Sequence, residues 1–277
     1  MMHSVRRLLV PLLLLAVGCK TFGADNGEPD ASTDAGPVEA PCPNGSLSFD
    51  GKAFVNVEPD DAFDSPSDLT VEAWILPDAG LGSTEVHIVS HHDDTNSDGW
   101  VMLLDGGLTF RVYSGSGKGS ATGGTLDEAK DDSLTLGQWH HVAAVFDGAA
   151  AAITLFIDGR SRGRNIGKKT KADPYKGPLR IGAAAYIGGN GFTGLIDEVR
   201  VSRVVRYPGA TSFKPAYPLP DAEDATIGTW HFLDGKSDKE IANEATGRFT
   251  STLATYATTA PSYPVSKLST CPTGARP

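Results

Sequence analysis

The chain lacks an excess of positive charge and, beyond its first residues, lacks long apolar runs. Its 24 Lys and Arg residues stand against 34 Asp and Glu residues, which gives a formal net charge of −10. Because nucleic-acid phosphates repel such a chain, we expect no nucleic-acid partner. The one strongly apolar run, residues 8–17, is shorter than a transmembrane helix requires. We therefore expect no membrane-spanning helix.

Residues 1–18 have the pattern of a signal peptide, in which a short basic start precedes the apolar run. The run ends in Gly18 and Cys19, which resembles the cleavage site of bacterial lipoproteins, with Ala16 where that family usually has Leu. The resemblance implies cleavage before Cys19 and a diacylglycerol on its sulfur. It also implies a place in the bacterial cell envelope, on the periplasmic face or the cell surface. The alternative is an ordinary secretory signal with a chance cysteine.

Cysteine is scarce, with only three residues in the chain, at positions 19, 42 and 271. If Cys19 carries lipid, Cys42 and Cys271 remain as a pair that brackets the rest of the chain. In an oxidising compartment we expect these two to form a disulfide. Closing so long a loop would constrain the unfolded chain by about 4–5 kcal/mol. The alternative is two free thiols.

Residues 19–41 contain few apolar side chains and are rich in Gly, Ala, Asp, Glu, Pro, Ser and Thr. Such a composition cannot bury enough apolar surface to become ordered, so we expect a disordered tether. About twenty flexible residues give a typical reach of about 25 Å. The N-terminal lipid would then be the only membrane contact, and residues 42–277 would form one domain.

Helical periodicity is absent after residue 42, and short strand-like runs take its place. They are rich in Val, Ile, Leu, Phe and Trp, and Asp-Gly turns follow several of them. Many short strands joined by hairpin turns predict an all-β fold, a two-sheet antiparallel sandwich. The expected strands are residues 47–49, 54–57, 69–76, 85–90, 100–104, 108–113, 140–146, 153–157, 179–182 and 196–201.

Four of these segments carry a family resemblance. Residues 137–147 (GQWHHVAAVFD) and 194–201 (GLIDEVRV) resemble signature strands of the laminin-G-like jelly roll, which shares its fold with concanavalin A-like lectins and glucanases. Residues 47–51 (LSFDG) and 70–75 (TVEAWI) resemble the early strands of that family. The resemblance implies a jelly-roll β-sandwich with its core in residues 45–205. That fold is mostly used for binding, above all of glycans and surface proteins.

The C-terminal part resembles the opening of a jelly-roll unit. Residues 229–235 (TWHFLDG) and 243–247 (NEATG) carry this likeness, yet in the family such a piece precedes the LSFDG strand. We interpret the chain as circularly permuted, with residues 226–271 closing the sheet. An orphan strand would leave unpaired backbone groups and an exposed edge. The alternative is a truncated second repeat that lies loosely on the surface.

The resemblance implies a structural calcium ion at Asp197. Alternation places Asp197 on the apolar face of its strand and turns Glu198 and Arg200 toward water. In related sandwiches the matching Asp binds Ca²⁺ with backbone carbonyls of an early strand, which here would bring Asp50 and Gly51 near it. The alternative is that Asp197 accepts hydrogen bonds from backbone N–H groups.

A second calcium candidate is the acidic segment after residue 93. Asp94, Asn96 and Asp98 match the start of an EF-hand loop, and Asp105 occupies its twelfth position. Calcium prefers such clusters of oxygen ligands. No helix flanks the segment, so the alternative is a polar turn between two strands.

Three features could meet a ligand. Trp100 and Tyr113 could each stack on a sugar ring if exposed. A basic cluster could bind an anionic polysaccharide, a lipid headgroup or an acidic partner. The alternative is that these residues only form a solvated hairpin loop. This cluster comprises Arg160, Arg162, Arg164, Lys168, Lys169 and Lys171.

No catalytic residue is predicted. Glucanases of this fold place their carboxylates as Glu-x-Asp-x-x-Glu, and the chain has no such triplet. We therefore expect a non-catalytic module that binds a glycan or a cell-surface partner. The alternative is a structural or adhesive envelope protein that binds protein. A glycosidase whose carboxylates come from separate strands is the least favoured interpretation.

Overall fold

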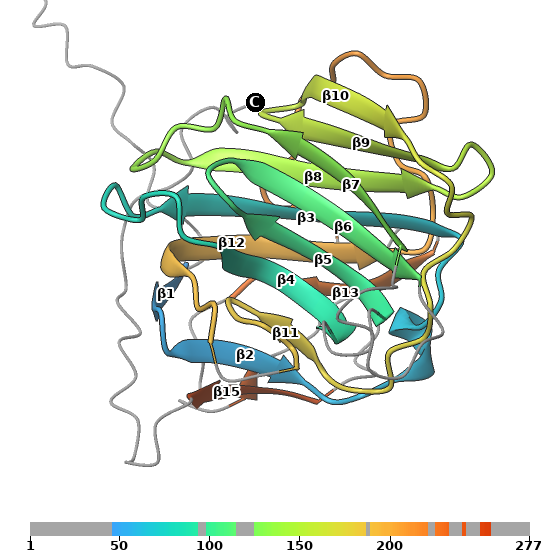
Figure 1. The fold of residues 1–277 in the computed structure, drawn as a ribbon. Coiled ribbons are helices and arrows are strands. Elements are labelled where there is room, and N and C mark those ends of the chain that lie inside the picture. Colours follow the sequence, from blue (N-terminus) through green and yellow to red (C-terminus); the bar gives the residue numbers. More distant parts are fainter. Residues whose placement is uncertain are drawn as a thin grey trace, which may run out of the picture. The chain divides into compact units, whose positions relative to one another are not determined.

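The computed structural model describes residues 46–93, 98–114, 125–186, 189–220, 225–232, 240–241 and 250–255. Strands dominate these residues, and every strand pair is antiparallel. One short 3-10 helix, η1, spans Asp61–Phe63. Two sheets contribute to one shared apolar core (Figure 1). The predicted two-sheet antiparallel jelly-roll sandwich is confirmed.

The first sheet has the order β1-β12-β3-β8-β9-β10, with β13 also paired to β12. We call it sheet A. Its strands are β1 (Leu47–Asp50), β3 (Asp68–Pro77), β8 (His140–Asp147), β9 (Ala152–Ile157), β10 (Arg160–Ile166), β12 (Thr193–Ser202) and β13 (Thr226–Trp230).

The second sheet, sheet B, has the order β14-β15-β2-β11-β4-β5-β6-β7. Its strands are β2 (Ala53–Val57), β4 (Val86–Asp93), β5 (Asp98–Leu104), β6 (Leu108–Ser114), β7 (Thr125–Asp131), β11 (Leu179–Ile181), β14 (Glu240–Ile241) and β15 (Ser251–Thr255). No helix in the described ranges is long and apolar enough to cross a membrane.

Alternation along the strands builds the core. In β3, Leu69, Val71, Ala73 and Ile75 all point into the space between the sheets. The residues between them face the other side of sheet A, and these too are buried, including Glu72. The outer face of sheet A must therefore be covered.

The cover is residues 203–220, which we call the strap. Thr70 Oγ1 donates a hydrogen bond to the Val204 carbonyl (2.7 Å), and Trp74 Nε1 donates to the Ala216 carbonyl (3.0 Å). On the strap, Tyr207 and other apolar side chains pack on Phe156 of β9. The strap is thus fixed to sheet A at several points along its length.

The C-terminal segment supplies strands to both sheets. β13 pairs with the second half of β12, while β1 pairs with the first half on the same edge. β15 pairs with β2 along its whole length. Trp230 is fully buried, and its Nε1 donates to Ser251 Oγ (3.0 Å). These pairings agree with closure of the sandwich by this segment rather than a loose surface repeat. The circular permutation and the disulfide stay predictions, since Cys42 and Cys271 lie outside the described residues.

Candidate functional site

Neither predicted aromatic platform reaches the surface, and this expectation was wrong. Trp100 is fully buried in the core and its Nε1 donates to the Phe63 carbonyl (3.2 Å). Tyr113 is only 6% exposed, and its ring stacks on that of His92 at 5.3 Å. Trp100 lies on the core face of β5, whereas Tyr113 packs with the smaller apolar cluster of Val101 and Leu103.

The first predicted calcium set does not come together. Asp50 pairs with Thr193, four residues from Asp197 along β12, which is about 13 Å at the rise of a strand. Asp50 instead accepts hydrogen bonds from two backbone N–H groups of its own turn. Asp197 accepts the N–H of Glu198 (2.9 Å) and the hydroxyl of Tyr217 (3.0 Å). This arrangement matches the alternative of backbone N–H bonding.

Glu198 and Arg200 are buried rather than turned toward water, so that prediction was wrong. The pairing of β12 with β3 shifts register between Asp197 and Arg200, and Glu198 has a φ of 54°. Such a bulge breaks the alternation on which the prediction rested. Glu198 accepts the N–H of Leu219 (2.6 Å) and lies 2.7 Å from His231 Nδ1. Burial first, and then the neighbouring Glu198 charge, raise the pKa of Asp197 to about 8.

The second predicted calcium set is also incomplete. Asp98 begins β5 and Asp105 follows its last residue, so about 23 Å of extended strand separates them. Asp105 instead lies 3.5 Å from Arg111 and 3.6 Å from Lys130. Including Asp105 was therefore wrong. Within the described ranges, no group of three or more His, Cys, Asp or Glu side chains is placed to hold a metal ion. Calcium binding by Asp94, Asn96 and Asp98 stays a prediction, because Asp94 and Asn96 lie outside those ranges.

The predicted basic cluster is exposed but does not gather on one face. β10 carries a bulge, and Arg160 pairs with Ile157 while Arg164 pairs with Thr154. Ile157 belongs to the core cluster and its strand alternates, so the two arginines point to opposite faces. Arg162 lies at the bulge. The backbone N–H groups of Lys168 and Lys169 donate hydrogen bonds to Asp127. Lys171 is exposed. Positive charges and a bulge on an edge strand discourage pairing with other chains.

The structure reveals a hollow that sequence reasoning missed. It lies where η1 meets residues 175–177 and has a volume of about 320 Å³. Asp60 caps η1, since its Oδ1 accepts the N–H of Ala62 (2.8 Å). The hollow, which we call the tyrosine hollow, is lined by Pro59, Asp60, Asp61, Asp64, Tyr175, Lys176 and Gly177.

Lys176 bridges two of the three carboxylates that line the tyrosine hollow, those of Asp61 and Asp64. Its Nζ donates to Asp61 Oδ1 (2.8 Å) and Asp64 Oδ2 (2.5 Å), and His91 Nε2 lies 3.3 Å from the other Asp64 oxygen. Burial alone would raise the pKa of Asp64, but the hydrogen bonds from His91 and Lys176 outweigh it and lower that pKa. Asp64 is therefore ionised at neutral pH.

Tyr175 forms an aromatic wall of the same hollow. Its hydroxyl donates to the Ala185 carbonyl (3.2 Å), and its ring lies 5.1 Å from the ring of His91. The side chain is half-buried, so part of its ring is open to the hollow. An aromatic ring beside ionised carboxylates can contact both the C–H groups and the hydroxyls of a polar ligand.

Comparisons with known proteins identify a matching family and several solved structures of similar fold. Residues 49–209, more than half of the chain, match the family described as the Concanavalin A-like lectin/glucanases superfamily. A candidate carbohydrate-binding protein from Bacteroides ovatus shares 18% identity at a TM-score of 0.58, covering 76% of this chain and 58% of its own. The heptameric SAP-like pentraxin of Limulus polyphemus shares 18% identity at a TM-score of 0.40, covering 60% of this chain and 79% of its own.

This chain thus spans a little over half the length of the Bacteroides ovatus protein, and at such low identity the likeness concerns the fold alone. No curated protein sequence matches. The family match over residues 49–209 includes β3, β8 and β12, the strands that carry the resemblance seen in the sequence. The chain belongs to the concanavalin A-like lectin/glucanases superfamily.

Proposed function

We propose that this chain is a non-catalytic glycan-binding module, held at the bacterial cell envelope by a lipid on Cys19. The observation behind this proposal is the tyrosine hollow, in which the Tyr175 ring lies beside the carboxylates of Asp60, Asp61 and Asp64. Membership of a superfamily that includes lectins supports it. So does the fold shared with a candidate carbohydrate-binding protein.

A sugar would use both kinds of surface. Its hydroxyls would donate to the carboxylates, and its C–H face would pack on the exposed part of Tyr175. Hydrogen bonds to charged groups contribute about 1.5–3 kcal/mol each, against the entropy lost on binding. Two or three such contacts sum to about 3–9 kcal/mol before that entropy cost, so we expect weak binding, with a dissociation constant no lower than about 1 µM.

The carboxylates favour binding over hydrolysis. A glycosidase needs one carboxyl group held protonated as a general acid, through a raised pKa. Asp64 shows the opposite shift, because the hydrogen bonds of His91 and Lys176 lower its pKa. Asp61 is joined to the same Lys176 ammonium. Asp64 is therefore suited to accepting hydrogen bonds rather than giving up a proton.

The proposal is tested with a glycan-binding screen of the whole chain, purified in detergent, and its Tyr175→Ala and Tyr175→Phe variants. Tyr175→Ala removes the ring and should weaken binding at least tenfold. Tyr175→Phe keeps the ring and should retain most of it, although the hydrogen bond to Ala185 is lost. A folded chain that binds no glycan would contradict the proposal and favour a protein-binding or adhesive role.

Two further arms address the parts of the proposal that lie outside the described residues. The screen is repeated with calcium and with chelator, and loss of binding in chelator would support the calcium prediction at residues 94–98. Lipid attachment is tested by metabolic labelling with a radioactive fatty acid. The label should be absent from a Cys19→Ser variant, and an unlabelled wild-type chain would contradict the anchor.

A further inference from the structure

The last strand of sheet A, β10, and the residues that follow it carry a concentration of positive charge. Residues 160–171, which we call the basic segment, hold six of the chain's 24 Lys and Arg residues and no Asp or Glu, although the formal net charge of the chain is −10. Five of the six are exposed, and within the described residues none of these five side chains forms a hydrogen bond or an ion pair. They are Arg160, Arg162, Arg164, Lys168 and Lys171.

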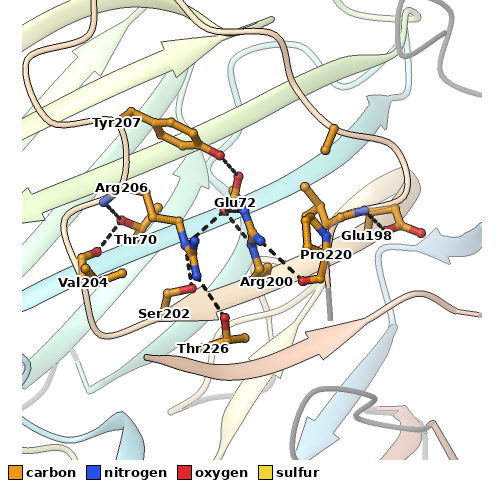
Figure 2. Close-up of polar contacts among 12 residues, drawn as sticks. Thr70, Glu72, Glu198, Arg200, Ser202, Val204, Arg206, Tyr207, Pro220 and Thr226 are labelled. Carbon is orange, nitrogen blue, oxygen red and sulfur yellow. Dashed lines mark hydrogen bonds and ion pairs between the residues drawn. The ribbon is translucent and has the colours of Figure 1, made fainter. Parts of the chain in front are cut away.

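Other cations on the outer face of sheet A are engaged by neighbouring groups (Figure 2). Arg200 donates to Glu72 Oε1 through Nε (2.8 Å) and Nη2 (2.7 Å). Arg206 Nε donates to Ser202 Oγ (3.0 Å), and its Nη2 donates to Thr226 Oγ1 (2.9 Å). These two arginines stabilise the packing of the strap on sheet A. The exposed cations of the basic segment have no such partners in the part of the chain that the structure describes.

The carboxylates around the basic segment bind other groups. Asp127 of β7 accepts two backbone N–H groups of the segment, at 2.6 and 2.7 Å. Asp158, just before the segment, lies 2.8 Å from His140 Nδ1. Even when these two and Asp173, which follows the segment, are counted against its six cations, three positive charges remain. The excess of positive charge is therefore local to this edge of sheet A.

Arg162, Arg164 and Ile166 share one side of β10, the strand that ends sheet A (Figure 1). The pairing with β9 is regular over the second half of β10, where Arg164 lies opposite Thr154. Thr154 stands between two core residues of β9, so this side is the outer face of the sheet. Alternate residues of a strand point to the same side. Two free guanidinium groups and one apolar side chain thus face the solvent together.

Ile166 is unusual because it is apolar and 58% exposed. It is the more exposed of the two large apolar side chains that the described residues leave exposed. Proteins that lie on a membrane surface combine cations, which attract anionic headgroups, with apolar side chains that enter the boundary of the acyl chains. An acidic polysaccharide would use the cations but would gain little from Ile166. The combination therefore favours a lipid surface.

Protection of the sheet edge explains only part of this charge. Cations on an edge strand discourage pairing with other chains. Lys168 and Lys171, however, lie beyond the end of β10. An exposed Ile166 on the strand itself would promote association rather than discourage it. The segment is also separate from the tyrosine hollow, which none of its residues lines.

We propose that the basic segment binds the surface of an anionic phospholipid bilayer. Arg162 and Arg164 would lie against the headgroup phosphates, with Ile166 at the boundary of the acyl chains. Each cation close to such a surface strengthens binding about fivefold, and the attraction fades within about 8 Å at physiological salt. The inference rests on the proposed function only in that a lipid on Cys19 would hold the segment near a bilayer.

The test measures co-sedimentation of the whole chain with lipid vesicles, in its Cys19→Ser form so that no lipid anchor contributes. The vesicles contain phosphatidylcholine alone or with about 30% phosphatidylglycerol. The chain should bind the anionic vesicles at least about tenfold more tightly than the neutral ones. Arg164→Glu should weaken binding to the anionic vesicles at least about tenfold, because it replaces an attraction with a repulsion.

Two matched controls separate the surface from general effects. Lys52→Glu makes the same charge change on an exposed residue beside β1, at the other end of sheet A from β10, and should change binding less than about twofold. Ile166→Ser should weaken binding at least about threefold, because an apolar side chain no longer leaves water. Leu126→Ser removes the other exposed apolar side chain, on sheet B, and should have no effect.

Equal weakening by Arg164→Glu and Lys52→Glu would overturn the inference, since only net charge would then matter. So would equal binding to the two kinds of vesicle. Polygalacturonate is measured in parallel, and binding to it without binding to anionic vesicles would replace the lipid with an acidic polysaccharide. The proposed function is judged separately, by the Tyr175→Ala variant and by labelling of Cys19. A chain that binds no glycan or carries no lipid can still bind anionic vesicles through this segment.

Discussion

The buried carboxyl group of Asp197 should make the stability of this protein fall as the pH rises from 5 to 8. Asp197 is 1% exposed and lies next to Glu198 at the bulge of β12. Burial and the Glu198 charge raise the pKa of Asp197 to about 8, against 3.8 for an ordinary Asp. Between these values the folded state holds a proton that the unfolded state has released. Stability from this group is therefore complete below about pH 4 and is lost as the pH rises toward 8.

Asp197→Asn removes this titration with little change in shape. The amide oxygen can still accept the N–H of Glu198, and the amide nitrogen can donate to the Tyr217 hydroxyl oxygen. One pH unit of differential protonation corresponds to about 1.4 kcal/mol. Over the three units from pH 5 to 8, the wild type should lose up to about 4 kcal/mol more than the variant.

The assay is urea unfolding followed by tryptophan fluorescence at pH 5, 6, 7 and 8. Asp50→Asn is the matched control, since it makes the same substitution at an exposed residue whose pKa is lowered and which therefore does not titrate in this window. Its stability curve should run parallel to that of the wild type. If the Asp197→Asn curve also ran parallel, Asp197 would be ionised in the folded state and the reasoning would be refuted.

Two further predictions concern stability. Arg200→Met should lower the free energy of unfolding by about 3–5 kcal/mol, because it leaves the buried Glu72 carboxylate without its main ion pair. Adding Glu72→Leu should recover part of that loss in urea unfolding, whereas an additive further loss would contradict the pairing. Deleting residues from 226 onward should unfold the domain, because it removes β13, β15 and the core residue Trp230. A truncated chain with unchanged thermal unfolding would show that the segment is dispensable.

Hydrophobic alternation was enough to predict most strands and the sandwich. β3, β8 and β9 bury one apolar face in the core, so their pattern survives in the sequence. β7 and β10 were missed, because β7 ends sheet B, β10 ends sheet A, and both are mostly polar. Edge strands need no apolar face on either side, so their sequences resemble loops.

The predicted site residues failed where their environment depends on remote segments. Trp100 was a candidate sugar platform, yet β5 turns it into the core. Arg200 was expected in water, but the bulge at Glu198 and the strap bury it against Glu72. Neither the bulge nor the strap leaves a local pattern, because both are fixed by contacts with residues more than a hundred positions away, such as the Trp74 bond to the Ala216 carbonyl.

The class of fold, the family and the acidic character of the chain can be predicted from the sequence, because periodicity and composition are local and additive. Which polar residues form sites depends on contacts between distant parts of the chain. Tyr175 and Lys176 are far along the chain from Asp60 and Asp61, yet they line one hollow. Thr70 and Trp74 of β3 are likewise joined by hydrogen bonds to the strap, more than a hundred positions further along the chain. The charge and the exposure of these side chains depend on the segments that pack over them. Only the folded chain brings those segments together.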